Sequence, residues 1–115
     1  MANPDVNAIP LAAIDVSNPR LYRDDTAGPL FARLRHEDPV HFCAESAYGP
    51  YWSITKYDDI VRVNSDDASF SCDYRFGGHI LGYEQLFCQH GVDARMFQST
   101  DAPTHTAQRK AVAPI

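Results

Sequence analysis

Two side chains near the end of this sequence have types and spacing suited to binding an anion: His105 and Arg109, four residues apart. Asp101 and Pro103 predict that a helix begins just before them, because aspartate can cap free amides and proline already holds the helical φ. Four residues advance a helix by about 6 Å and turn it about 40° past one revolution. Both side chains therefore share a face and can reach one carboxylate, through the planar donor fork of arginine and an N–H of histidine.

Taken alone, such a pair is also typical of an ordinary solvated helix face, so the surrounding elements must decide. The first 25 residues predict an extended arm, because they carry three prolines and few periodic apolar positions. A helix follows, with Pro29 in its first turn and Pro39 stopping it.

A β-hairpin is predicted next, because residues 40–43 and 51–55 are rich in strand-favouring side chains and 46–50 have turn chemistry. Asp58 or Asp59 can then cap a short helix. This order predicts a mainly α fold with a small β-sheet (α+β), a pattern that also fits many unrelated α+β domains.

The regular pattern dissolves between residues 70 and 100, where glycines interrupt scattered apolar residues. A structureless segment of this length inside a compact domain is uncommon unless it is functional. Gly77 and Gly78 lack the spacing of a dinucleotide or phosphate loop, so backbone freedom explains them better.

Composition narrows the class of protein. A net charge of −5 and a pI near 5.3 give no basic surface for nucleic acid. No signal peptide and no run of about 18 apolar residues is visible, which predicts a cytoplasmic protein without a membrane span. The last residues, 111–115, are apolar and directly follow a newly begun helix, so we expect an N-terminal fragment of a longer protein.

The cysteines Cys43, Cys72 and Cys88 form an odd set without a C-x-x-C spacing, which favours free thiols in a reducing compartment. Cys88 and His90 offer two possible zinc ligands, but no second pair accompanies them, and ordinary packing explains them better. We therefore expect no metal ligand in this chain.

The segment from Asp101 to Arg109 resembles the start of helix C in the cytochrome P450 superfamily, where an Asp-x-Pro turn leads into His-x-x-x-Arg. The resemblance covers nearly the whole chain and points to the soluble bacterial branch that hydroxylates alkanes at the terminal carbon. The further segments that carry it are Ile14-Asp15-Val16-Ser17-Asn18-Pro19, Glu37-Asp38-Pro39-Val40-His41, Gly49-Pro50-Tyr51-Trp52-Ser53 and Phe70-Ser71.

The resemblance implies the N-terminal part of one cytochrome P450 domain, truncated in helix C. It assigns residues 1–25 to an arm, 26–69 to helix A, a hairpin and helix B, 70–100 to the B–C loop, and 101–115 to the start of helix C. The oxygen-activating helix, the Glu-x-x-Arg pair and the loop with the iron-ligating cysteine are missing. This fragment alone would hold no catalytic residue or iron ligand, and would be inactive.

The resemblance also implies specific binding residues. His105 and Arg109 would bind a propionate of haem b, whose thiolate ligand lies outside the fragment. The B–C loop covers the substrate pocket in the family, so Ile80, Leu81, Met96 and Phe97 are candidates to line an apolar channel. The alternative is that these four side chains anchor the loop to the core.

The implied activity is that of a haem-thiolate monooxygenase. It would insert one oxygen atom from O₂ into a C–H bond of an apolar substrate, with terminal hydroxylation of medium-chain n-alkanes or fatty acids expected. Ferredoxin and ferredoxin reductase would supply electrons, and Lys110 is a candidate to face the donor. The alternatives are a small acidic α+β binding module without haem, and a cytochrome P450 that acts on a terpene or an aromatic acid.

Overall fold

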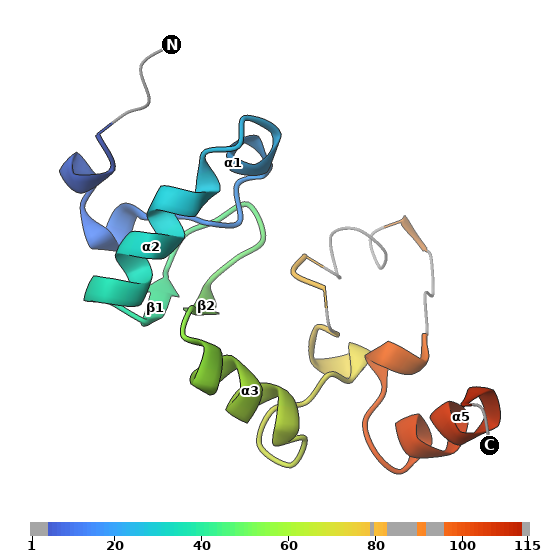
Figure 1. Ribbon diagram of the computed structural model, residues 1–115. Coiled ribbons are helices and arrows are strands. Elements are labelled where there is room, and N and C mark those ends of the chain that lie inside the picture. Colours follow the sequence, from blue (N-terminus) through green and yellow to red (C-terminus); the bar gives the residue numbers. More distant parts are fainter. Residues whose placement is uncertain (1–4, 79, 83–89, 92–95, 114–115) are drawn as a thin grey trace. The chain divides into compact units, whose positions relative to one another are not determined.

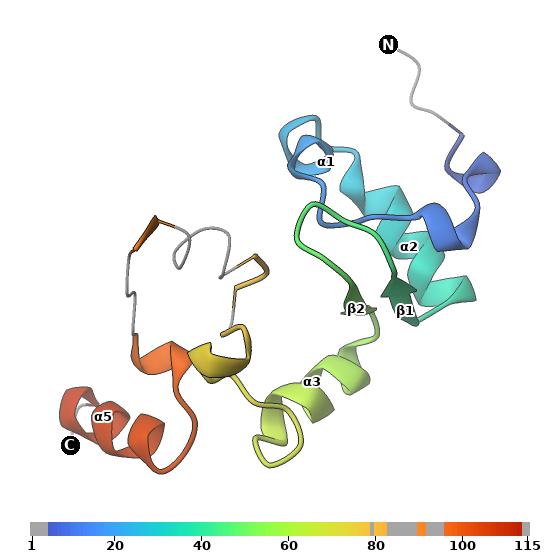
Figure 2. The same ribbon diagram turned by 180° about the vertical axis from the view of Figure 1, so that it is seen from behind.

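The computed structural model describes residues 5–78, 80–82, 90–91 and 96–113. The chain forms two compact units, Met1–Val61 and Arg62–Ile115. Figures 1 and 2 show the helices and strands of each unit from opposite sides. Among the described residues, no helix has the length and apolar character needed to cross a lipid bilayer.

The core of the first unit is built on helix α2, Ala27–Glu37. Its buried positions, Ala27, Leu30 and Leu34, recur at the three- and four-residue spacing that puts side chains on one helix face. They pack with Ile14 and Val16 from the preceding segment, and Leu34 is fully buried. Partly buried side chains surround this cluster: Val6, Ile9, Leu11, Leu21, Phe31 and Tyr51.

The expectation of an extended arm over residues 1–25 is wrong for the described residues 5–25, and residues 1–4 lie outside the description. Two of the prolines that suggested it, Pro10 and Pro19, lie at the starts of helical segments, where a missing N–H costs little and a fixed φ helps. Pro19 is the first residue of its helix, and the Asn18 side chain accepts a hydrogen bond from the Arg20 amide at 3.0 Å. The segments are 3-10 turns over Val6–Ala8 and Leu11–Ala13, and helix α1 over Pro19–Arg23.

Arg33 fastens the beginning of the chain to α2. Its Nη1 donates to the carbonyl oxygens of Val6 at 2.6 Å and Ile9 at 2.5 Å, while Nε donates to the Glu37 carboxylate at 3.1 Å. The Arg33 side chain is only 12% exposed, so these bonds replace water on a mostly buried guanidinium.

The predicted hairpin is confirmed. Strand β1, Val40–Cys43, pairs antiparallel with β2, Tyr51–Ile54, in a register that puts Cys43 opposite Tyr51. Alternation along β1 buries His41 and Cys43 and exposes the intervening residues. On the exposed side, the rings of Phe42 and Trp52 lie with their centroids 4.8 Å apart.

Buried polar groups tie the hairpin to residues 14–17. His41 has its Nδ1 2.8 Å from a carboxylate oxygen of Asp38 and its Nε2 3.1 Å from the Ile14 carbonyl oxygen. The Tyr51 hydroxyl donates to the Asp15 carboxylate at 2.7 Å. Burial and this bond raise the pKa of Tyr51. Partial burial raises the pKa of Asp15, but hydrogen bonds from Ser17 and Tyr51 outweigh it and leave that pKa below its usual value.

Helix α3, Tyr57–Ser65, follows the hairpin as expected. The predicted cap is wrong, because the helix already begins at Tyr57 and both Asp58 and Asp59 lie inside its first turn. In that position the two carboxylates face the positive end of the helix dipole.

We expect Leu34→Ala to lower the free energy of unfolding by about 2–5 kcal/mol, because it leaves a cavity in a fully buried site. Chemical denaturation of the complete gene product checks this. Val40→Ala is the control in the same unit, because Val40 is 45% exposed. Equal effects of the two substitutions would contradict the assigned core.

Candidate cofactor and substrate site

The predicted helix near the end of the chain is present as α5, Thr104–Val112. It carries His105 in its first turn and Arg109 one turn later, so the two share a face. His105 is partly exposed and Arg109 is exposed. Both residues lie in the second unit, together with the segment 70–82.

The predicted capping role of Asp101 is wrong. Pro103 occupies the N-cap position, and no side chain caps the helix there. The backbone carbonyl of Asp101 accepts a hydrogen bond from the His105 amide at 2.9 Å. Its carboxylate turns elsewhere and accepts hydrogen bonds from the Ser71 hydroxyl and, at 2.9 Å, from the Cys72 amide.

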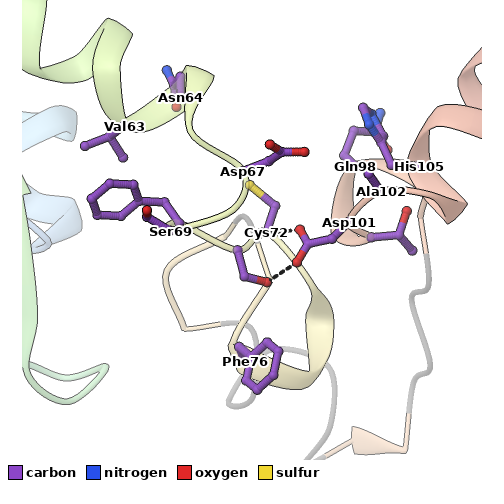
Figure 3. Close-up of a pocket in the computed structure, with 13 residues that line it drawn as sticks. Val63, Asn64, Asp67, Ser69, Cys72, Phe76, Gln98, Asp101, Ala102 and His105 are labelled. Atoms are coloured by element: carbon purple, nitrogen blue, oxygen red, sulfur yellow. Dashed lines mark hydrogen bonds between the residues drawn. The ribbon is translucent and has the colours of Figure 1, made fainter.

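A cavity of about 560 Å³ lies in this unit, and Figure 3 shows its walls with the dashed bond of Asp101 beside it. His105 contributes to one wall, and residues at the end of α3 and in the segment after it contribute to another. The cavity is lined by Val63, Asn64, Asp67, Ser69, Phe70, Ser71, Cys72, Phe76, Gln98, Thr100, Asp101, Ala102 and His105.

The structure brings one predicted substrate residue, Phe97, to one of the two predicted cofactor residues, His105. The Phe97 ring stacks on the His105 ring, with centroids 6.0 Å apart and planes 14° from parallel. Met96 lies next to Phe97 and lines a second cavity, of about 350 Å³, with Thr104 and Gln108 of α5. Met96 and Phe97 are each 38% exposed, so apolar surface faces outward here.

The other two predicted substrate residues are not brought into this group. Ile80 and Leu81 belong to the short described stretch 80–82, and neither is among the described residues that line the two cavities. Leu81 is 45% exposed and Ile80 is partly buried.

The electrostatics of α5 suit an anion. Within the described part of the chain, the Arg109 side chain makes no ion pair or hydrogen bond, and its donor fork is not engaged by an acidic residue. Lys110 is exposed beside it. The donor set of His105 and Arg109 therefore fits a carboxylate-bearing ligand such as a haem propionate.

Sequence reasoning missed Phe76, which lines the larger cavity and is 77% exposed. Arg75 lies 6.0 Å from the centre of its ring, and the Asp73 carboxylate accepts two hydrogen bonds from Arg75, each at 2.8 Å. The turn ends at Gly77, whose φ of 108° favours glycine. The Asp-x-Arg spacing before two glycines was the available signal for this turn.

Cys88 lies outside the described residues, so the structure does not test its pairing with His90. Among the residues that the structure does describe, no group of three or more His, Cys, Asp or Glu is arranged to hold a metal ion. Cys43 is buried and Cys72 is exposed, and both are free thiols.

Comparison with known proteins indicates which class of protein this chain resembles. The chain is 35% identical over 104 residues to linalool 8-monooxygenase of Pseudomonas putida. Its structure is similar to that of cytochrome P450-153 from Novosphingobium aromaticivorans, with a TM-score of 0.72 and 35% identity. It is also similar to CYP153D17 from Sphingomonas sp. PAMC 26605, with a TM-score of 0.76 and 41% identity. No protein-family model matches the chain.

The fold is that of the N-terminal part of a cytochrome P450, a mainly helical fold with a small two-stranded sheet at this end. By sequence and structure together, the chain is similar to the N-terminal part of cytochrome P450 proteins. Each comparison covers 87% of this chain, but only 26%, 28% and 24% of the respective relatives. The chain thus spans about a quarter of the length of these proteins.

We expect Arg75→Ala to raise the pKa of Asp73 toward the ordinary value of about 4. The side-chain hydrogen bonds from Arg75, followed by its backbone N–H, hold that pKa at about 2. Since the folded-state pKa is depressed, the carboxylate stabilises the turn above about pH 4. This stabilisation is lost as the pH falls toward 2.

Titration of the Asp73 carboxyl carbon by NMR checks this prediction. Arg23→Ala is the control, because it removes another arginine–aspartate pair, the exposed one with Asp24, and leaves Asp73 untouched. An unchanged Asp73 titration in Arg75→Ala would show that the pair does not cause the shift.

Proposed function

We propose that this chain forms the propionate-binding and substrate-covering part of a cytochrome P450 monooxygenase. The observation that carries the proposal is the pair His105 and Arg109 on one face of α5, where Arg109 has no acidic partner among the described residues. The chain around this pair is similar to a monooxygenase and to two cytochrome P450 structures over 87% of its length. That similarity favours a monooxygenase over the alternative of a small acidic binding module.

His105 and Arg109 would hold one propionate of haem b. Arg109 provides two parallel N–H donors and His105 one, and hydrogen bonds to an ionised acceptor are the stronger kind. Together they would fix one edge of the macrocycle and compensate its negative charge. When bound with a thiolate ligand, the haem supplies the activation of O₂ and the transfer of one oxygen atom.

The exposed apolar side chains of the 70–100 segment support an apolar substrate. Leu81, Met96 and Phe97 each keep more than a third of their surface exposed, with Phe97 stacked on His105. Apolar walls with few polar anchors exclude water and orient a flexible chain by its shape. We propose terminal hydroxylation of medium-chain n-alkanes or fatty acids, the activity that the sequence resemblance implies.

A terpene alcohol is the second candidate substrate. It is favoured by the 35% identity to a protein named linalool 8-monooxygenase. Competition between n-octane and linalool, read as product ratio, separates the two classes. The class that yields the larger kcat/KM is the assigned one.

Electron delivery by a ferredoxin and its reductase completes the proposal. Lys110 is exposed and about 100° around the helix from Arg109, so it can face an acidic donor protein while Arg109 faces the propionate.

We expect Arg109→Ala to accelerate haem loss from the complete gene product by about tenfold or more, because a propionate loses its bidentate partner. Transfer of haem to an excess of an acceptor protein measures the rate. Lys110→Ala is the matched control, because it removes the neighbouring charge from a different side of the helix. The same rate in Arg109→Ala and the parent protein would remove Arg109 from the site.

We expect Leu81→Trp to change the ratio of terminal to subterminal products, because it adds bulk to an apolar side chain that is 45% exposed in the covering segment. Gas chromatography of the products from n-octane measures the ratio. Ile60→Trp on α3, at a side chain with similar exposure of 39%, is the control. A product ratio that stays fixed would place Leu81 outside the substrate channel.

A further inference from the structure

We propose that Asp101 is a positioning residue for His105: its carboxylate clamps the beginning of α5 onto residues 71 and 72, and so fixes where His105 presents its ring. This inference rests on the proposed function, because it assigns His105 to a propionate. It concerns Asp101 and its bonds to Ser71 and Cys72, whereas the proposed function concerns His105 and Arg109.

The clamp joins two segments that are far apart in sequence. Asp101 accepts from the Cys72 amide at 2.9 Å and from the Ser71 hydroxyl, across separations of 29 and 30 residues. Figure 3 shows the Asp101 side chain directed toward the loop that carries Cys72. The two carboxylate oxygens bind different donors, so both are engaged.

The Ser71 hydroxyl also contacts the residue that begins the next turn, Asp73. Its oxygen accepts a hydrogen bond from the Asp73 amide at 3.0 Å. Asp73 is itself buried and paired with Arg75, and it caps the turn over Tyr74–Phe76. The clamp is therefore attached to an ordered turn and not to a loose loop end.

The backbone of Asp101 connects the clamp to His105. Its carbonyl oxygen accepts the His105 amide at 2.9 Å, so one residue holds residues 71 and 72 through its side chain and the first turn of α5 through its main chain. The Phe97 ring lies against the His105 ring. The ring of His105 is thus fixed by a stack and by the place where the helix begins.

The charge of Asp101 contributes to this role. A carboxylate binds an amide and a hydroxyl more strongly than a neutral acceptor does. Asparagine keeps one acceptor oxygen for the Cys72 amide and loses the charge, whereas alanine loses both bonds. Asp101→Asn should therefore weaken the clamp in part, and Asp101→Ala should remove it.

The first measurement needs no cofactor. We expect Asp101→Ala to raise amide hydrogen exchange in the first turn of α5 of the haem-free gene product by about tenfold, and Asp101→Asn by less. Asp58→Asn removes the same charge from an exposed site on α3 and should change nothing. Exchange in Asp101→Ala equal to that of the parent protein overturns the proposal.

The second measurement is a double-mutant cycle on the rate of haem loss. Asp101→Ala should accelerate loss by about tenfold in the parent protein and should add almost nothing in a His105→Ala background. If the rate of haem loss in the double variant rises by the product of the two single effects, the proposal is overturned, because Asp101 then acts independently of His105.

If Asp101→Ala does not fold, Ser71→Ala removes one bond of the clamp, and its effect must also vanish in the His105→Ala background.

Two further results separate this proposal from the proposed function. If His105→Ala and Arg109→Ala both retain haem like the parent, the propionate site itself is wrong and the inference falls with it. If only the cycle shows independence, the site stands and the positioning role is overturned.

Discussion

Closure of the segment between residues 72 and 101 is the constraint on which the second unit depends. Bringing the ends of a loop of this length together costs chain entropy, although the cost grows only slowly with length. The bonds of the Asp101 carboxylate to Ser71 and Cys72 offset part of that cost at the base of the loop. Leu81, Met96 and Phe97, which lie between these ends, can then remain exposed, because closure does not require their burial.

The first unit is held by a different balance of forces. Its aliphatic core, centred on Leu34 and Ile14, supplies most of the driving force, and polar groups inside it are matched to partners. His41 is the clearest case, because both of its ring nitrogens face acceptors, Asp38 and the Ile14 carbonyl. The described side chains leave no buried polar atom without a partner. This unit can therefore serve as a rigid support.

The hairpin and α2 were predictable from the sequence because their signals are local. Alternation and β-branched residues define the strands, and a proline in the first turn with an apolar stripe defines the helix. The arm was mispredicted because Pro19 reads as a helix breaker in isolation, although at the first helical position it begins one. The position of His105 on a helix was equally accessible, since Pro103 marks the place where that helix begins.

The rest of the site depends on contacts between residues distant in sequence. Asp101 was expected to cap its own helix, and no local pattern reveals that donors 29 and 30 residues earlier take its carboxylate instead. The cavity position of Phe76 and the stack of Phe97 on His105 arise in the same way. Propensity describes a residue's neighbours along the chain, whereas these interactions are set by neighbours in space.

Arg33 has a consequence for how the beginning of the chain can vary. Its guanidinium binds the carbonyl oxygens of Val6 and Ile9, which every residue type carries. The two hydrogen bonds therefore do not depend on which side chains residues 6 and 9 carry. Substitutions at these positions affect the attachment only through the size of the apolar side chain that packs against the core. One arginine on α2 thus gives the opening residues freedom to drift in sequence while their backbone stays docked.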